Sequence, residues 1–547
     1  ASWNRTSPPE MRLRERVAAV WSAQGVMAQS IPNYRPRHGQ QAMAEAVADI
    51  LETGGVLVVE AGTGVGKTYA YLVSALLSGE RVMVSTATKA LQDQLVGRDL
   101  PLLQAALGLP VRVALLKGRS SYLCRHRLDL ARQAEVAYPI TVQRDLAQVE
   151  SWAAQTTRGD LAELATLDED SDAVPLVTST RDNCLASHCP RWTSCHVYQA
   201  RRNAMEAELV VVNHHLFFAD LVVRESGVAE LLPRVHAVIF DEAHQLNDIG
   251  VPFLSHRVEA AAPEAALLTI APAIEELLDE PGALHRSWVF TSATLGYEPG
   301  LDAYLETTGL QNRARVLHVP SPFDYANQAA LYVPTQMPDV GTSAHSLAVA
   351  DLAAEAASVL GGRTLVLTTS LRAMRAIAQR LRERLQSNAD PQVRVQGESS
   401  KRALTDALRQ RGPNAAVGVI LVACVTFWEG IDVPGDALQL VIIDKLPFSP
   451  PDDPLLQMRA ARLKDMGRNP FMELHVPQAA VLLKQGAGRL IRSETDRGVL
   501  VVCDGRLVQK PYGRKIVAAL PPMRRLHGEP EFQEALLALT KPSTMAR

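Results

Sequence analysis

The 547-residue sequence lacks the features that assign a protein to a class most directly. It contains no apolar run approaching the ~18 residues that a membrane-spanning helix needs, so we expect no membrane segment. It also lacks a basic excess, because its formal net charge is −3, and such a balance does not by itself indicate binding to nucleic acid. A binding site for a polyanion would have to be a local groove. Evidence for the function therefore has to come from sequence motifs.

Cysteine is scarce, and no secretory signal is recognisable. Residues 1–34 are polar and lack the continuous apolar core of such a signal. We therefore expect a cytosolic protein, in which disulfides are uncommon. Of the six cysteines, Cys424 and Cys503 each lie in an apolar run and are expected to be buried strand residues. The other four fall between residues 124 and 195.

Short apolar runs rich in β-branched residues alternate with stretches of helical pattern. Runs that are apolar throughout favour strands buried on both faces, as in parallel sheets covered by helices. The βαβα pattern occurs twice, so we predict an α/β fold with two such domains. A proline-rich hinge is expected over residues 317–346. The predicted strands are 56–59, 82–85, 111–115, 209–212, 235–240, 288–291, 364–368, 393–396, 417–422, 438–443 and 499–502.

A glycine-rich loop follows the first predicted strand and precedes a helical pattern. Glycines let backbone N–H groups approach phosphate oxygens closely, and the N-terminus of the next helix favours an anion. Lys67 is expected to reach the β- and γ-phosphates of ATP, and the Thr68 hydroxyl to bind Mg²⁺. The loop comprises Ala61, Gly62, Thr63, Gly64, Val65, Gly66, Lys67 and Thr68.

Asp241, Glu242, Ala243 and His244 directly follow the strand predicted at residues 235–240. In a P-loop enzyme, an Asp at the end of a strand adds a carboxylate to the Mg²⁺ site. Glu242 is then placed to orient and deprotonate the attacking water. An acidic pair after a strand is more often a solvated turn, but the preceding P-loop favours the catalytic interpretation, with His244 completing the motif.

Gln485, Arg489 and Arg492 belong to a third motif, in the second half of the chain. Two arginines three residues apart lie on one face of a helix. Guanidinium groups supplied by a second domain can stabilise charge on the γ-phosphoryl group in the transition state. An isolated arginine pair of this kind would be an ordinary surface feature. If both domains contribute to one site, hydrolysis becomes sensitive to the domain arrangement.

Cys124, Cys184, Cys189 and Cys195 are candidate ligands of one metal centre. Four converging thiolates suit either a [4Fe–4S] cluster or a structural Zn²⁺. Zinc sites typically have a close cysteine pair on both sides, and the isolated Cys124 departs from that pattern. Both alternatives remain open on spacing alone.

These motifs together resemble those of superfamily 2 helicases of the XPD/DinG type, most closely the YoaA branch. The resemblance extends from about Tyr34 to Leu520 and includes Thr291–Leu295, Phe427–Asp432 and the Lys117–Cys124 segment. It implies two RecA-like domains in tandem and a 5′→3′ ATP-dependent DNA helicase. It also implies a [4Fe–4S] cluster held by the four cysteines in an insertion of the first domain.

Further site residues follow only from this resemblance. Arg37 and Gln40 match the adenine-side motif. For Asn213, His214 and His215 the ordinary interpretation is local packing and capping. A role in communication with DNA is slightly favoured over it. The remaining matches are the DNA-contacting residues Thr86, Thr88 and Lys89 and the coupling residues Trp428, Glu429 and Asp432.

Two departures from the family pattern are visible. Ser121 replaces an Asn beside the first cysteine. Relatives also insert a helical Arch domain before the Thr-Ser-Ala-Thr motif, whereas the interval from His244 to Thr291 is too short for a complete one. The expected domains are an extension (1–33), helicase domain 1 (34–320) with a cluster insertion (117–205) and an Arch remnant (250–286), and helicase domain 2 (321–547).

The resemblance implies single-stranded and forked DNA as partners of a monomeric protein acting in repair or replication. YoaA-like proteins also suggest the chi subunit of the replicative clamp loader, with the stretch after Leu520 as a candidate docking surface. A reduced Arch favours an alternative, namely an ATP- or redox-gated DNA-binding protein that does not unwind duplexes. An RNA helicase is a third possibility.

Overall fold

The computed structural model describes residues 11–31, 34–134, 136–164, 166–168, 170–225, 231–258, 269–280, 286–298, 300–387, 391–399, 401–409, 418–424, 427, 433, 435–450 and 452–541. Its contacts divide the chain into two compact units. The first unit is Ala1–Val59, Lys67–Thr291 and Thr307–Leu317, and the second is Glu60–Gly66, Ser292–Glu306 and His318–Arg547. Each unit is described by itself below.

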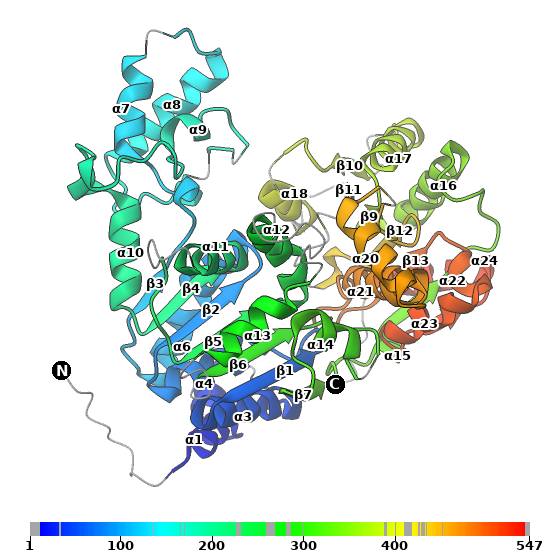
Figure 1. Ribbon diagram of the computed structural model, residues 1–547. Helices are drawn as coiled ribbons and strands as arrows, with labels where there is room; N and C mark the ends of the chain where they lie inside the picture. The colour runs from blue at the N-terminus through cyan, green and yellow to red at the C-terminus, as the bar shows by residue number, and fades with distance from the viewer. Residues whose placement is uncertain are drawn as a thin grey trace. The chain divides into compact units, whose positions relative to one another are not determined.

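The first sheet has seven strands in the order β3-β4-β2-β5-β6-β1-β7 (Figure 1). Pairing is parallel between β3 and β4, β4 and β2, β2 and β5, and β5 and β6. The bounds are β1 Gly55–Ala61, β2 Val82–Thr86, β3 Val113–Leu115, β4 Leu209–Asn213, β5 Ala237–Asp241, β6 Ser287–Ser292 and β7 Ala314–Val319.

Burial explains why these segments form strands. All five residues of β2 and of β5 are buried, as expected for inner strands covered on both faces. The Phe240 ring stacks on Trp288 and Phe290 of the neighbouring β6, with centroids 6.3 and 5.0 Å away. Helices α3 (His38–Thr53) and α4 (Lys67–Ser78) pack against each other beside this sheet.

The second sheet also has seven strands, in the order β10-β11-β9-β12-β13-β8-β14, and all its pairings are parallel. Successive residues of its inner strands enter two different hydrophobic clusters. Val441 and Ile443 join one, and Leu440 and Ile442 the other, because side chains alternate between the faces of a strand. The bounds are β8 Ala329–Tyr332, β9 Thr364–Thr368, β10 Gln392–Val395, β11 Val419–Cys424, β12 Leu440–Ile443, β13 Gly498–Val502 and β14 Arg524–Leu526.

Helices complete both faces of this second sheet. Helices α16 (Ser343–Leu360), α17 (Leu371–Arg384) and α24 (Glu529–Thr540) supply residues to one cluster, and α21 (Val476–Ala487) and α23 (Pro511–Ala519) to the other. The expectation of two α/β domains with parallel sheets is therefore confirmed.

A helical insertion separates β3 from β4 in the first unit. Helices α7 (Arg125–Gln133), α8 (Ile140–Ala153) and α9 (Val174–Val177), cyan to teal in Figure 1, share a small core of their own. The insertion joins the sheet through Lys117, whose side chain is 1% exposed. Its Nζ lies 2.7 Å from Asp93 of α5 (Lys89–Gln94) and 2.6 Å from Asp160 of the insertion.

Three strands were missed by the sequence prediction. β7 has one buried residue, β14 has three residues, and β8 reads Ala-Ala-Leu-Tyr, so none shows the long apolar run of an inner strand. β8 and the short helix α15 (Tyr325–Gln328) occupy part of the predicted hinge. Between the expected motifs, α12 (Leu246–Val258) and α13 (Ala271–Asp279) are the described elements of the short Arch interval. No described helix combines the length and hydropathy of a membrane span.

Candidate active site

The glycine-rich loop connects β1 to α4. Gly64 and Gly66 have φ angles of 86° and 85°, a conformation that side chains disfavour. A Cβ atom on Gly64 would also overlap the ring of Phe323, which belongs with this loop to the second unit. Lys67 and Thr68 form the first turn of α4, where unpaired backbone N–H groups favour a bound anion.

Asp241 is a nearly buried carboxylate at the end of β5. The Tyr71 hydroxyl donates a hydrogen bond of 2.9 Å to its Oδ2 atom. Burial and the charge of Glu242 raise the pKa of Asp241 to about 6, while the Lys67 charge and the Tyr71 hydrogen bond act in the opposite direction. The structure therefore brings together Lys67, Asp241 and Glu242 in the first unit, together with a tyrosine that the motifs did not indicate.

Glu242 adopts a left-handed backbone conformation, with φ 55° and ψ 43°. This conformation is uncommon for residues other than glycine and costs of order 1 kcal/mol or more, and such strain tends to occur at functional sites. The Glu242 backbone N–H donates to Asp241 Oδ1 at 3.0 Å. The Glu242 carboxylate lies 3.4 Å from Nδ1 of His244. The turn thus directs two adjacent carboxylates differently.

His214 connects the strand before the predicted DNA segment to this acidic motif. Its imidazole is fully buried, and Nδ1 lies 2.7 Å from the hydroxyl of Ser85 in β2. Burial lowers the pKa of His214 to about 3, against the raising effect of the Asp241 and Glu242 backbone. The ring is therefore neutral at physiological pH and is held between β2 and the end of β5. The neighbouring Asn213 caps α11 (His214–Glu225) by accepting from Leu216 N at 2.9 Å.

Within the second unit, the Glu60 carboxylate contacts three groups. Its Oε1 atom lies 3.0 Å from Nζ of Lys484 in α21. Its Oε2 atom accepts backbone N–H bonds from Leu295 at 2.7 Å and Gly296 at 3.0 Å. The following residue, Gln485, donates to the Thr294 hydroxyl at 3.2 Å. Gln485 and the Thr-Ser-Ala-Thr motif are therefore in direct contact.

The first part of the glycine-rich loop contacts the segment after β7. The Ser321 hydroxyl donates to the Thr63 carbonyl at 2.6 Å. Burial raises the pKa of Tyr325, while hydrogen bonds to Ser321 and Thr63 and the Arg492 charge lower it. A Cβ atom on Gly488 would lie 3.2 Å from the Thr63 hydroxyl. The motif that carries Arg489 and Arg492 therefore neighbours the loop within the second unit.

The other predicted residues lie in the described elements as follows. Arg37 directly precedes α3, whose buried Gln40 lies in the first turn. Thr86 ends β2, and Thr88 caps α5 by accepting from Leu91 N at 3.3 Å, with Lys89 exposed beside it. Trp428, Glu429 and Asp432 lie outside the described residues. The roles of all these residues stay predictions.

The four cysteines lie in the insertion of the first unit. All are half-buried free thiols. Burial and the charges of Cys189 and Cys195 raise the pKa of Cys124, so these three thiols are neighbours. The Ala186 N–H donates to Cys184 Sγ at 3.4 Å.

The donor set fits a cysteine-ligated centre by its chemistry, although the geometry is not that of a closed site. Within the described ranges, no three His, Cys, Asp or Glu side chains converge as ligands of one ion. Cys124 and Cys195 directly precede helices α7 and α10 (His196–Glu206), whereas Cys184 and Cys189 flank a single 3₁₀ turn. The choice between iron–sulfur and zinc stays open.

Four residues of the site were missed from the sequence: Tyr71, Ser85, Glu60 and Lys484. Tyr71 follows Lys67 by one helical turn, and this i, i+4 spacing is a signal that could have placed it on the same face. The pairing of Glu60 with Lys484 spans 424 residues and leaves no local pattern.

The chain is similar to known helicase families and to individual helicases. The family described as DEAD/DEAH box helicase matches residues 40–165, and the family described as Helicase C-terminal domain matches residues 353–523. The chain is 38% identical to the ATP-dependent DNA helicase YoaA of Escherichia coli, covering 92% of this chain and 96% of that protein. It is 32% identical to the ATP-dependent helicase DinG of Mycobacterium tuberculosis, covering 93% and 96%.

The fold is similar to a solved structure of XPD helicase. The TM-score is 0.56 at 14% identity, over 90% of this chain and all of that structure. The alignment with the Escherichia coli relative spans 625 positions, more than the 547 residues here, so that relative carries internal or terminal segments without a counterpart.

Tyr71→Phe is expected to raise the Mg²⁺ concentration that ATP hydrolysis requires. The variant loses the hydrogen bond that orients Asp241, and a bond to a charged group contributes about 1.5–3 kcal/mol. We expect the Mg²⁺ concentration for half-maximal hydrolysis to rise about tenfold. A magnesium titration of the initial rate measures this change.

Tyr69→Phe is the matched control. Tyr69 lies on the same helix, but its hydroxyl faces Asp99 at 3.5 Å instead of Asp241. Equal effects of the two substitutions would contradict the role assigned to Tyr71.

Proposed function

Because the chain belongs to the DEAD/DEAH-box helicase family that includes the YoaA and DinG proteins, we propose that it is an ATP-dependent DNA helicase moving 5′→3′ on single-stranded DNA. The observation that carries this proposal is the buried Asp241 beside Lys67, with the Glu242 carboxylate next to it and 3.4 Å from His244. In this proposal Lys67 binds the phosphates, and Thr68 and Asp241 hold Mg²⁺. Glu242 orients and deprotonates the attacking water.

We further propose that Gln485, Arg489 and Arg492 respond to the γ-phosphate. The contact of Gln485 with Thr294 supports this, because it links their motif to the end of β6. Arginines can stabilise the charge that develops on the transferred group. The remaining predicted ATP contacts are Arg37 and Gln40 on the adenine side and the loop residues from Ala61 to Gly66.

In the same proposal, Thr86, Thr88 and Lys89 bind the DNA strand, and His214 transmits its binding to the acidic motif. His214 lies between Ser85, adjacent to Thr86, and the backbone of Asp241 and Glu242. A displacement of β2 by bound DNA would therefore reach the carboxylates through one rigid, neutral ring. Trp428, Glu429 and Asp432 are proposed to act in coupling.

Cys124, Cys184, Cys189 and Cys195 are proposed to hold a [4Fe–4S] cluster. Four free thiols in one insertion, three of them electrostatically coupled through Cys124, support this ligand set. The cluster would fix the loops between α9 and α10 against the start of α7. These helices otherwise share only a small core.

The proposed partners are single-stranded and forked DNA, bound by a monomer in the bacterial cytosol during repair or replication. The chi subunit of the clamp loader is a further proposed partner. For docking, the C-terminal helix α24 offers only its outer face, where Leu537 is 55% exposed. Its inner face, including Phe532 stacked on Tyr332, belongs to the core.

Lys67→Ala is expected to abolish ATP hydrolysis stimulated by single-stranded DNA and all strand separation. The wild-type chain should unwind a duplex with a 5′ single-stranded tail and leave a 3′-tailed duplex intact. Steady-state hydrolysis and a gel-based unwinding assay measure these effects, with the exposed Lys541→Ala as control.

Equal hydrolysis with and without DNA would overturn the motor proposal. Stimulated hydrolysis without strand separation would favour the non-unwinding regulatory ATPase. Greater stimulation by a matched RNA strand would favour an RNA helicase.

His214→Leu is expected to lower the ratio of DNA-stimulated to basal hydrolysis about tenfold or more, with a smaller change in the basal rate. The leucine fills the space but cannot bond Ser85, and a lost buried hydrogen bond costs about 1–3 kcal/mol. His215→Leu is the control, because His215 faces Phe253 at 6.1 Å instead. A uniform loss of both rates in His214→Leu would indicate a structural role only.

Cys189→Ser is expected to remove bound iron and the visible absorption of a cluster from protein purified without air. Cys503→Ala, a fully buried thiol outside the insertion, should leave both unchanged. Iron and zinc analysis of the same samples discriminates the two centres, because stoichiometric zinc without iron would contradict the cluster.

A further inference from the structure

An aromatic cavity lies in the second unit, beyond the carboxyl ends of β12 and β13. Phe448 follows β12, and Phe471 and Tyr512 lie against it, with ring centroids 5.4 and 5.9 Å away. The Phe471 and Tyr512 centroids are 5.1 Å apart. Phe471 is nevertheless 38% exposed. In parallel sheets, ligands bind outside the carboxyl ends of the strands.

The cavity has a volume of about 360 Å³, enough for one planar heterocycle. Polar groups line it beside the rings: the Ser449 hydroxyl, the Gln457 amide, the His475 imidazole and the Arg506 guanidinium. A flat aromatic wall with a few hydrogen-bonding groups suits a ligand with both a π face and polar edges.

Arg506 is held in place for such a contact. The buried carboxylate of Asp504 accepts hydrogen bonds from the Nε atom of Arg506 at 2.9 Å and from a terminal nitrogen of Arg506 at 2.7 Å. The guanidinium carbon then lies 5.6 Å from the centre of the Phe448 ring. Asp504 also accepts from Leu446 N at 2.9 Å, so the strand ends and the arginine form one fixed base for the cavity.

The exposed ring is presented by an unusual helix. Residues Phe471–His475 form a π-helix that leads into α21. Such turns are rare, and they occur often at functional sites. Here the turn places both Phe471 and His475 on the wall of the cavity, with ring centroids 6.4 Å apart.

Exposed cations lie on helix α20 (Pro454–Asp465), which supplies Gln457 to the wall, and on or directly before helix α23, which supplies Tyr512. Together they are called the basic rim. None has an ion-pair partner in the part of the chain that the structure describes. They are Arg462, Lys464, Lys510, Arg514 and Lys515.

Several neighbouring acids are already engaged. Asp453 caps α20 by accepting from Leu456 N at 2.9 Å, Glu473 pairs with Arg468, and Asp504 holds Arg506. The exposed Asp452 and Asp465 lie at the two ends of α20 and balance its cations, whereas α23 carries no acidic residue. The positive charge that complements a polyanion is therefore that of Lys510, Arg514 and Lys515.

We propose that this cavity takes one base of a single DNA strand, stacked on Phe471, while the basic rim contacts the adjacent phosphates. The inference rests on the proposed function, because it names a further contact of the same strand. Aromatic platforms combined with arginine are the usual means of holding single strands without sequence preference. A peptide added as a β-strand does not fit, because β12 and β13 are paired on both sides.

The test compares binding of two oligonucleotides by fluorescence anisotropy. One is oligo-dT, and the other has the same phosphate backbone with every base removed. We expect Phe471→Ala to weaken the affinity for oligo-dT about tenfold and to leave the affinity for the abasic strand unchanged. Phe471→Trp, which restores a ring, should recover most of the lost affinity.

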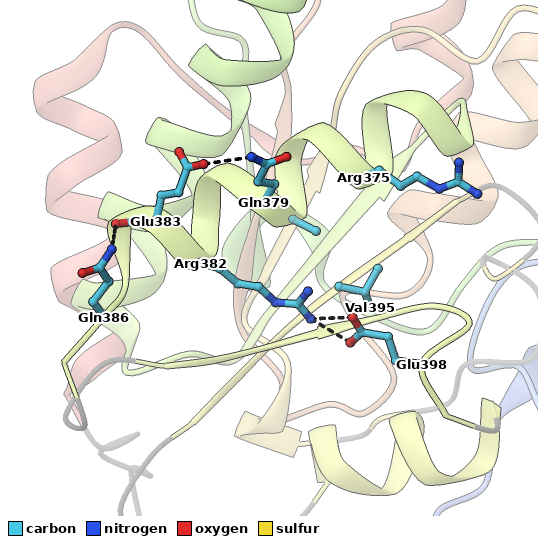
Figure 2. Close-up of a pocket in the computed structure, with 8 residues that line it drawn as sticks. Arg375, Gln379, Arg382, Glu383, Gln386, Val395 and Glu398 are labelled. Carbon is cyan, nitrogen blue, oxygen red and sulfur yellow. Dashed lines mark hydrogen bonds and ion pairs between the residues drawn. The ribbon is translucent and has the colours of Figure 1, made fainter.

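A second cavity supplies the control. It lies between α17 and β10 and has a volume of about 430 Å³, and its eight described lining residues include no aromatic ring. Figure 2 shows Arg382 bonded to Glu398 and Gln379 to Glu383. Gln379→Ala should change neither affinity.

The outcomes separate this inference from the proposed function. If wild-type protein binds neither strand, the DNA function fails. If it binds both strands and Phe471→Ala weakens both equally, or neither, the base site is overturned while the function stands. Circular dichroism of the variants checks that each one is folded.

Discussion

A single carboxylate, Asp241, constrains the organisation of the nucleotide site in the first unit. It is 5% exposed at the end of a strand whose other residues are apolar and buried. Burying an ionised carboxylate without partners costs several kcal/mol. The Tyr71 hydroxyl, the Lys67 charge and the Glu242 backbone N–H offset part of that cost, and the pKa of Asp241 is still raised to about 6. The neighbours of Asp241 are therefore required by its burial before any nucleotide binds.

The same constraint explains why the histidine at position 214 is neutral. A charged ring in this fully buried position would need a carboxylate of its own, whereas the Asp241 carboxylate interacts with Lys67 and Tyr71 and the Glu242 carboxylate with His244. A neutral imidazole can accept from or donate to the Ser85 hydroxyl and still face the backbone of the acidic turn. Rigidity, rather than charge, is then what this residue contributes, because a buried ring between two inner strands has no alternative position.

The sequence predicted the inner strands because their β-branched runs reflect burial on both faces. It could not find β8, whose four residues include two alanines, or β7, in which only Val319 is buried and arginine and histidine interrupt the apolar residues. Motif residues such as Lys67 and Asp241 were recognisable because short spacings encode them. Tyr71 and Glu60 act through contacts that span 170 and 424 residues, and a single sequence gives no sign of such pairs.

The cysteines illustrate a different limit. Their positions predicted one insertion. Because Cys124 precedes the other three cysteines by most of that insertion, contacts between residues distant in the sequence must hold it near them. Lys117 supplies part of that restraint, because it is buried between Asp93 and Asp160. Removing one member of a buried charge cluster typically costs about 3–5 kcal/mol, since an uncompensated charge remains. The cation therefore ties α5, which carries Lys89 of the segment predicted to bind DNA, to the insertion that holds the four cysteines.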